Sequence, residues 1–255
     1  MSVLERFTLE GQTAIVTGGN RGIGKAIARG LADAGANVVI ANRTLESGEE
    51  AAAEISEETG AEAIAVRTDV SEEADVSALV DATVEEFGGI DVLVNNAGIA
   101  IHGGAEEKPL EEWQETIDVN LTGTFLCSKY AGREMIEGGG GSIVNVTSMS
   151  AYIANYPQKH VDYQASKGGM EAFSRQLASE WAEHGVRVNN IAPGYVATEI
   201  LVDDEELLNT WKSEMLQDEL ARPEDIAPLA VYLASDASSY VTGESIVIDG
   251  GYTVR

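Results

Sequence analysis

The 255-residue sequence has one cysteine, Cys127, and no apolar run long enough to span a bilayer. A single cysteine excludes an internal disulfide and favours a reducing compartment. The N-terminus also lacks the basic and apolar regions of a signal peptide. These absences predict a cytoplasmic protein that is not inserted in a membrane.

Basic residues are scarce as well, because 16 lysines and arginines face 43 aspartates and glutamates, for a formal net charge of −27. Such a charge repels nucleic acid and anionic membranes, so neither is expected as a partner. The acids occur in short groups along the chain rather than in one tail. That pattern fits ordinary solvated helix faces, or a surface adapted to high salt, where screening relieves self-repulsion. We favour the second, halophilic interpretation.

The three histidines are scattered at positions 102, 160 and 184 and form no zinc-type motif, so no metal site is expected. Proline is rare, at five residues, and no Pro-rich linker, internal repeat or change of composition divides the chain. With 44% apolar residues, the sequence therefore predicts one folded domain over residues 1–255.

Short strand-like runs alternate with longer helical segments along the chain. This alternation predicts an α/β fold with a doubly wound parallel sheet of about seven strands and helices on both faces. In such sheets, ligands bind in the crevice outside the carboxyl ends of the strands. The expected strands are residues 12–17, 37–41, 62–67, 91–95, 142–147, 186–192 and 244–249.

A glycine-rich loop, Thr17-Gly-Gly-Asn-Arg-Gly-Ile-Gly24, joins the first strand to an alanine-rich helix. Glycines let the backbone approach a pyrophosphate, and a helix N-terminus favours its negative charge. The loop predicts a dinucleotide site, with a glycine turn that binds no ligand as the alternative.

Asn42-Arg43 follows the second strand, where an acidic residue would accept the ribose hydroxyls and select NAD. A guanidinium in that place suits a 2′-phosphate, and Arg21 in the glycine loop adds a second positive charge. These residues predict a preference for NADP(H) over NAD(H), unless Arg43 is only a solvent-exposed side chain.

Tyr163-x-x-x-Lys167 has the spacing that places two side chains on one helix face. A free tyrosine is a poor base because its pKa is about 10, and a neighbouring ammonium favours the phenolate. Ser148 follows a strand and so faces the ligand crevice. The three residues predict acid–base chemistry. Taken alone, the pair also fits a surface lysine beside a half-buried tyrosine.

Together these segments resemble the short-chain dehydrogenase/reductase family from about residue 8 to residue 254. The resemblance implies a Rossmann-like fold and a homotetramer, with the helices that hold Asn120 and Tyr163 at one interface and the last strand and C-terminus at another. The matching motifs are Thr17-Gly18-x-x-x-Gly22-x-Gly24, Asn95-Asn96-Ala97-Gly98, Asn120, Ser148, Tyr163-x-x-x-Lys167, Pro193-Gly194 and Asp249-Gly250-Gly251.

The resemblance also implies a role for each catalytic residue. Tyr163 moves the proton of the substrate hydroxyl, and Lys167 lowers the pKa of Tyr163 and binds the nicotinamide ribose. Ser148 holds the substrate oxygen, and Asn120 supports a water that relays protons through Lys167. The cofactor-binding residues expected are Gly18, Asn20, Arg21, Gly22, Ile23, Gly24, Asn42, Arg43, Asp69, Val70, Asn96, Ala97, Gly98, Tyr163, Lys167, Pro193, Gly194, Val196 and Thr198.

The 15-residue step from Ser148 to Tyr163 and the segment between them look like those of sugar and polyol dehydrogenases. A substrate with many hydroxyls needs matching hydrogen-bonding side chains. Residues 199–217 follow a strand end and are expected to form either a lid over the crevice or a fixed surface helix. The substrate-contacting residues expected are Ser150, Asn155, Gln158 and Tyr195.

The sequence also fits two other functions. The first is a reductase of 3-oxoacyl thioesters of the acyl-carrier-protein type, or of small ketones. The second, from another class, is a catalytically silent dinucleotide-binding sensor, because a fold does not determine a function. The intact set of Asn120, Ser148, Tyr163 and Lys167 favours an NAD(P)-dependent enzyme over the sensor.

Overall fold

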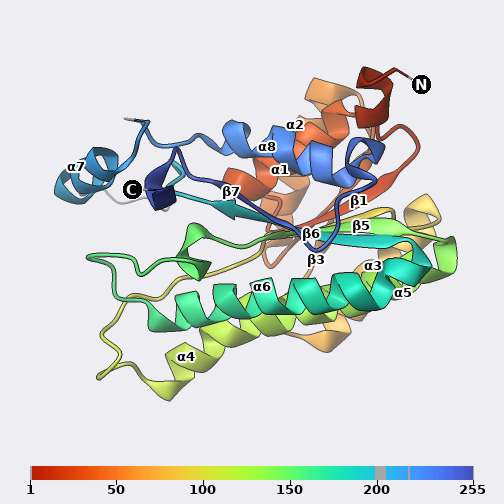
Figure 1. The fold of residues 1–255 in the computed structure, drawn as a ribbon. Helices are drawn as coiled ribbons and strands as arrows, with labels where there is room; N and C mark the ends of the chain where they lie inside the picture. Colours follow the sequence, from red (N-terminus) through yellow and green to blue (C-terminus); the bar gives the residue numbers. More distant parts are fainter. Residues whose placement is uncertain (1, 199–204, 218, 255) are drawn as a thin grey trace.

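A seven-stranded parallel sheet forms the centre of the computed structural model, which describes residues 2–198, 205–217 and 219–254 (Figure 1). Its strand order is β3-β2-β1-β4-β5-β6-β7, with every neighbouring pair parallel. The predicted α/β fold class is therefore confirmed. The strands are β1 (Thr13–Thr17), β2 (Asn37–Asn42), β3 (Ala63–Arg67), β4 (Val92–Asn95), β5 (Gly141–Val146), β6 (Val186–Pro193) and β7 (Ser245–Ile248).

Helices cover both faces of this sheet, with α1, α2 and α8 on one face and α3, α4, α5 and α6 on the other (Figure 1). Successive strand residues point to opposite faces, so Ala14 and Val16 pack in the first core and Ile15 in the second. The helices are α1 (Gly22–Asp33), α2 (Leu45–Thr59), α3 (Glu73–Phe87), α4 (Leu110–Ile117), α5 (Gly123–Gly138), α6 (Val161–Trp181), α7 (Glu205–Glu214) and α8 (Pro223–Ala234). Short 3-10 turns cover Leu4–Phe7, Met149–Ala151, Ala182–His184, Asp236–Ser238 and Tyr252–Val254.

The helical segment around Asn120 is irregular. A π-helical turn, Asp118–Thr122, separates α4 from α5. Such turns widen a helix locally and are frequent at functional sites. The Asn120 amide binds the loop after β4, because Nδ2 donates to the Ile99 carbonyl (2.9 Å) and Oδ1 accepts from the Ile99 N–H (2.8 Å). The turn therefore joins this helical segment to a strand end.

A row of buried amides crosses the middle of the sheet on the α5/α6 face. Asn95, Asn145 and Asn190 lie in register on β4, β5 and β6. Asn95 Nδ2 donates to Asn145 Oδ1 (2.8 Å), and Asn145 Nδ2 donates to Asn190 Oδ1 (3.2 Å). Ser128 of α5 and Ser174 of α6 bind the same row. Polar groups buried in this way stabilise a fold only while each has its partners.

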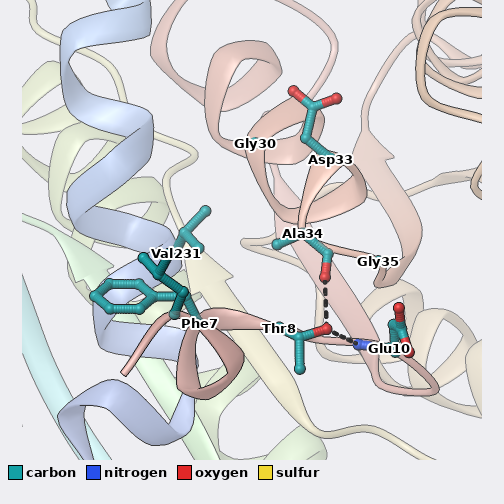
Figure 2. A pocket seen from close by; sticks show the side chains of 9 residues that line it. Phe7, Thr8, Glu10, Gly30, Asp33, Ala34, Gly35 and Val231 are labelled. Atoms are coloured by element: carbon teal, nitrogen blue, oxygen red, sulfur yellow. Dashed lines mark hydrogen bonds between the residues drawn. The ribbon is translucent and has the colours of Figure 1, made fainter. Parts of the chain in front are cut away.

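The structure has a shallow pocket between the Leu4–Phe7 turn, α1 and α8 (Figure 2). Thr8 Oγ1 donates to the Ala34 carbonyl there (3.4 Å) and accepts from the Glu10 N–H (3.3 Å). The pocket lies at the C-terminal end of α1, away from the carboxyl ends of the strands. It therefore does not coincide with the expected ligand crevice.

Cys127 is buried on α5, and burial raises the pKa of its thiol to about 12. This environment is that of a packing residue rather than a nucleophile. Within the described ranges, no helix is both long and apolar enough to cross a membrane.

Replacing Asn145 with alanine tests the amide row. The Asn95 amide would lose its Asn145 acceptor and Asn190 Oδ1 would lose its donor, so we expect the free energy of unfolding to fall by about 3 kcal/mol. Chemical denaturation at constant salt measures the change. The exposed Gln176→Ala, which removes only a bond to Glu180, should cost less than about 0.5 kcal/mol. Equal costs for both variants would contradict the role given to the row.

Candidate active site

Ser148 and Tyr163 meet at the carboxyl end of β5. Ser148 follows the strand, and its Oγ accepts from the Ser150 N–H (3.1 Å) and donates to Ser150 Oγ (3.0 Å). Its hydroxyl also hydrogen-bonds the Tyr163 hydroxyl, which comes from the first turn of α6. Burial raises the pKa of Tyr163, and the Ser148 hydrogen bond acts against that rise. The structure thus brings together the predicted proton-transfer residue and the predicted holder of the substrate oxygen.

Lys167 lies one helical turn after Tyr163 and is buried. Its Nζ is 5.6 Å from the centre of the Tyr163 ring and donates to the Val146 carbonyl (2.8 Å). Burial lowers the pKa of Lys167 to about 8, while the charge of Glu171 raises it. Burial therefore disfavours both the Tyr163 phenolate and the Lys167 ammonium, and such shifts are common at functional sites.

Asn120 reaches the same place from the π-helical turn. Its Nδ2 donates to Ser166 Oγ (3.0 Å), and the Ser166 hydroxyl donates to the Tyr163 carbonyl (2.7 Å). A Cβ added to Gly98 would lie 3.2 Å from Asn120 Oδ1 and 3.7 Å from Lys167 Nζ. Asn120 and Lys167 therefore lie against the bare backbone of Gly98, which follows β4.

The glycine loop after β1 forms a cradle that side chains would fill. Gly18 and Gly22 have positive φ angles of 64° and 53°. A Cβ at Gly24 would overlap the Gly18 carbonyl and Asn96 Nδ2, and one at Gly22 would lie 3.5 Å from Thr198 Cγ2. The loop opens at the N-terminus of α1, which favours anionic groups. These residues therefore fit the pyrophosphate of a dinucleotide.

Asn42 supports the start of α2 instead of projecting from the sheet. Its buried Nδ2 donates to the Thr44 carbonyl (2.6 Å) and to Ser47 Oγ (3.2 Å), and Asn20 of the glycine loop also donates to Ser47 Oγ (3.1 Å). Arg21 and Arg43 are exposed beside this cluster, at the ends of the neighbouring strands β1 and β2. Both guanidinium groups are therefore accessible at this edge of the cradle.

The other predicted cofactor residues also lie at strand ends. The Asn96 amide donates to the carbonyls of Thr17 (2.9 Å) and Gly18 (3.2 Å), and the Ala97 N–H donates to Thr17 Oγ1 (3.0 Å). Asn96 thus holds the glycine loop against β4. Asp69 and Val70 follow β3, Pro193 ends β6, Gly194 and Val196 follow β6, and Ile23 lies in the first turn of α1.

Three of the predicted substrate residues form one polar cluster. Asn155 Nδ2 and Gln158 Nε2 each donate to Tyr195 Oη (both 3.2 Å). The Tyr195 ring stacks on Trp211 of α7, with centroids 4.0 Å apart and planes at 11°. Part of the predicted lid therefore packs on this cluster, while residues 199–204 lie outside the described residues.

His160 is a polar residue beside Tyr163 for which the sequence analysis gave no role. Its side chain is 92% buried (8% exposed), and neither ring nitrogen has a hydrogen-bond partner among the described residues. Its ring centroid lies 5.2 Å from that of Tyr163 and 5.4 Å from that of His102. Burial lowers the pKa of His160 to about 4, so the ring is neutral at pH 7. The neutral ring can therefore donate one hydrogen bond and accept another beside Tyr163.

Residues 2–198, 205–217 and 219–254 contain no group of three or more His, Cys, Asp or Glu side chains that could hold a metal ion. The gathered residues instead comprise a tyrosine hydroxyl, a serine hydroxyl, a buried amine and an asparagine beside a dinucleotide cradle. Such a set can move a proton to or from a substrate oxygen next to a nicotinamide.

Comparison with known proteins gives relatives along nearly the whole chain. Residues 18–253 match the protein-family model for enoyl-(acyl carrier protein) reductase. D-threitol dehydrogenase of Mycolicibacterium smegmatis is 42% identical over 257 residues, which cover 100% of this chain and 98% of the relative. An NADP-dependent mannitol dehydrogenase of Hypocrea jecorina is 38% identical over 257 residues, covering 99% and 96%.

Solved structures agree with the fold. A short-chain type dehydrogenase/reductase from Mycobacterium marinum superposes with a TM-score of 0.97 at 41% identity, covering 100% of both chains. A gluconate 5-dehydrogenase from Burkholderia cenocepacia, in complex with NADP and tartrate, gives 0.95 at 35% identity and covers 100% of both chains. A 7α-hydroxysteroid dehydrogenase complexed with NADH gives 0.94 at 34% identity, covering 98% of both chains.

Proposed function

The chain belongs to the short-chain dehydrogenase/reductase family of oxidoreductases, and on that basis we propose that it interconverts a sugar or polyol and the corresponding ketone, with NADP(H) as the preferred cofactor. The observation that carries this proposal is the meeting of Tyr163, Ser148 and Lys167 beside a polar cluster built for hydroxyl groups. Relatives that act on threitol and mannitol support the substrate class.

In the proposed mechanism, the bound nicotinamide nucleotide accepts or supplies the hydride. Tyr163 Oη takes the hydroxyl proton during oxidation and returns it during reduction. Ser148 donates a hydrogen bond to the substrate oxygen. The Lys167 ammonium favours the Tyr163 phenolate against the burial that disfavours it. Asn120 holds the end of the proton path through its bonds to Ile99 and Ser166.

The remaining polar groups support a substrate with several hydroxyls. Asn155, Gln158 and Tyr195 each offer donors and acceptors, and the two unpaired nitrogens of His160 add a neutral donor and acceptor beside Tyr163. A site of this kind favours substrates with matching hydroxyls, because the unpaired nitrogens of His160 then gain partners. A substrate without further hydroxyls would leave these two nitrogens without partners.

A reductase of acyl thioesters is the second candidate, because the matching family model carries the name of an enoyl-thioester reductase. Whole-chain relatives that act on polyols favour the first candidate. One assay, turnover of polyols against turnover of acyl thioesters, distinguishes the two candidates. A catalytically silent sensor would turn over neither class of substrate.

Substrate screening of the wild type and of Tyr163→Phe tests the proposal. We expect the wild type to oxidise a sugar or polyol, and the variant to lose at least about 10³-fold in kcat, since it lacks the proton-transfer group. Nucleotide affinity, measured by fluorescence titration, should stay within about threefold of wild type because the ring remains. Absorbance of the reduced nicotinamide follows turnover of polyols, secondary alcohols, ketones and acyl thioesters.

The results separate the candidates. Turnover of thioesters alone would move the assignment to the second candidate, and tight nucleotide binding without any turnover would support the sensor. Substantial activity in Tyr163→Phe would refute the role of this hydroxyl.

Arg43→Ala tests the preference for NADP(H). We expect the ratio of kcat/KM for NADP to that for NAD to fall at least tenfold, because a charge-assisted bond to the added phosphate is lost. Isothermal titration calorimetry with 2′,5′-ADP and with ADP measures the contribution of Arg43 to binding of the 2′-phosphate without turnover. Arg67→Ala, on the adjacent strand β3 and ion-paired with Asp75, is the control and should change neither ratio. Asn42 is left unchanged, because an aspartate there would place a carboxylate against the Thr44 carbonyl.

We also propose that this single domain assembles as a cytoplasmic homotetramer adapted to high salt. Exposed Phe125 on α5 suits one interface, and edge strand β7 with its exposed Val247 suits another. The net charge of −27 opposes association of identical chains unless salt screens it. Sedimentation in molar salt should therefore give four copies, with dissociation and a lower Tm in dilute buffer. A monomer at high salt, or a tetramer indifferent to salt, would contradict this proposal.

A further inference from the structure

Glu171 is a buried carboxylate that has no role in the proposed proton transfer. It lies one turn after Lys167 on α6 and is only 4% exposed. Its Oε1 accepts from the Thr147 hydroxyl (2.7 Å), and its Oε2 accepts from Asn190 Nδ2 (2.9 Å). The Ser245 hydroxyl also donates to Oε2. Glu171 therefore joins α6 to β6, to β7 and to the residue that follows β5.

The same face of α6 contacts three consecutive residues at the end of β5. Residues spaced by four lie one above another on a helix, so Tyr163, Lys167 and Glu171 form one stripe. A shift of the helix against the strand would disturb all three contacts together. The contacts pair Tyr163 with Ser148, Lys167 with Val146, and Glu171 with Thr147.

The buried amide row also ends on Glu171. Asn95 donates to Asn145, Asn145 donates to Asn190, and Asn190 donates to the Glu171 carboxylate. Hydrogen bonds that point in one direction polarise one another. The row thus connects the interior of the sheet to a negative charge one turn from Lys167.

Few charged or titratable side chains surround the Glu171 carboxylate and the Lys167 ammonium. Lys167 is faced by Glu171 and Tyr163, and Glu171 is faced in addition by Tyr152 and Arg175. Arg175 is 60% exposed, and its NH1 lies 4.0 Å from Glu171 Oε2. The field of Glu171 raises the pKa of Lys167 against the burial that lowers it to about 8. Without that field, the buried amine would lose its proton at a lower pH.

We propose that Glu171 is a positioning residue for the Tyr163–Lys167 pair. Its hydrogen bonds hold this face of α6 against the end of β5, and its carboxylate balances the buried ammonium of Lys167. Lys167 in turn must stay protonated to favour the Tyr163 phenolate. The role rests on the proposed dehydrogenase mechanism but not on the identity of the substrate.

Profiles of kcat/KM against pH for Glu171→Gln test the proposed effect of the Glu171 charge on Lys167. Glutamine keeps the size of the side chain and removes the charge. We expect the basic limb of the profile to move by about one pH unit toward acid, because Lys167 is deprotonated earlier. A limb that stays in place would overturn this role. Arg175→Ala, which changes only the exposed neighbour, should give the wild-type profile, and an equal shift there would assign the effect to surface charge instead.

Glu171→Asp tests the role of the Glu171 hydrogen bonds in holding α6 against the end of β5. It also keeps the proposal testable if the glutamine variant does not fold. Aspartate keeps the charge but withdraws the carboxylate by one methylene from Thr147. We expect kcat to fall about tenfold with the basic limb in its wild-type place. A wild-type kcat, or a shifted limb, would overturn the proposal. All profiles are recorded with whichever secondary alcohol or ketone the wild type turns over, so failure on sugars and polyols counts against the proposed substrate and not against Glu171.

Discussion

Burial of the Lys167 ammonium is the constraint on which the rest of the site depends. A charge taken out of water is stable only where hydrogen-bond acceptors and opposite charge replace the solvent. Here the Val146 carbonyl accepts its hydrogen bond, and the Glu171 carboxylate lies one turn farther along α6. Both belong to the seam between α6 and the end of β5. The contacts that pack this helix on the sheet therefore also position the Tyr163 and Lys167 side chains.

The buried polar row explains why this seam is rigid. Amide side chains on β4, β5 and β6 occupy positions that most sheets give to apolar residues. They are stable because each donates to the next and because the last one meets a carboxylate. Directional bonds of this kind specify one register, whereas apolar packing alone tolerates small shifts. A register set across the sheet then determines where Ser148 stands relative to Tyr163.

The cofactor cradle and the polar cluster lie on the two sides of this seam. On one side, glycines leave backbone that a pyrophosphate can approach, and Asn96 fastens the loop to β4. On the other side, Tyr195 joins Asn155 and Gln158 and stacks on Trp211 of α7. The reacting carbon would therefore sit between a region built for phosphates and one built for hydroxyls, with Tyr163 at the boundary.

Much of the fold and site could be read from the sequence, because the signals are local. Strand–helix alternation, the glycine loop and the four-residue spacing of Tyr163 and Lys167 depend only on neighbours along the chain. Glu171 continues that spacing and could have been found by extending it. The sequence alone did not show that the Asn42 amide would bind the Thr44 carbonyl and Ser47 Oγ at the start of α2, because Ser47 belongs to the next helix. It also did not show the π-helical turn at Asn120, which depends on a loop about twenty residues away in the chain.

The sequence by itself determined the class of fold, the glycine loop and the spacing of the candidate proton-transfer residues, since each follows from short-range geometry and side-chain chemistry. Only the tertiary structure decided which buried groups face one another. Glu171 meets Thr147, Asn190 and Ser245 from three different segments, and His160 lies against Tyr163 without a partner among the described residues. The physical reason is that burial and pairing depend on strand order and register, which bring together residues that are far apart in the chain.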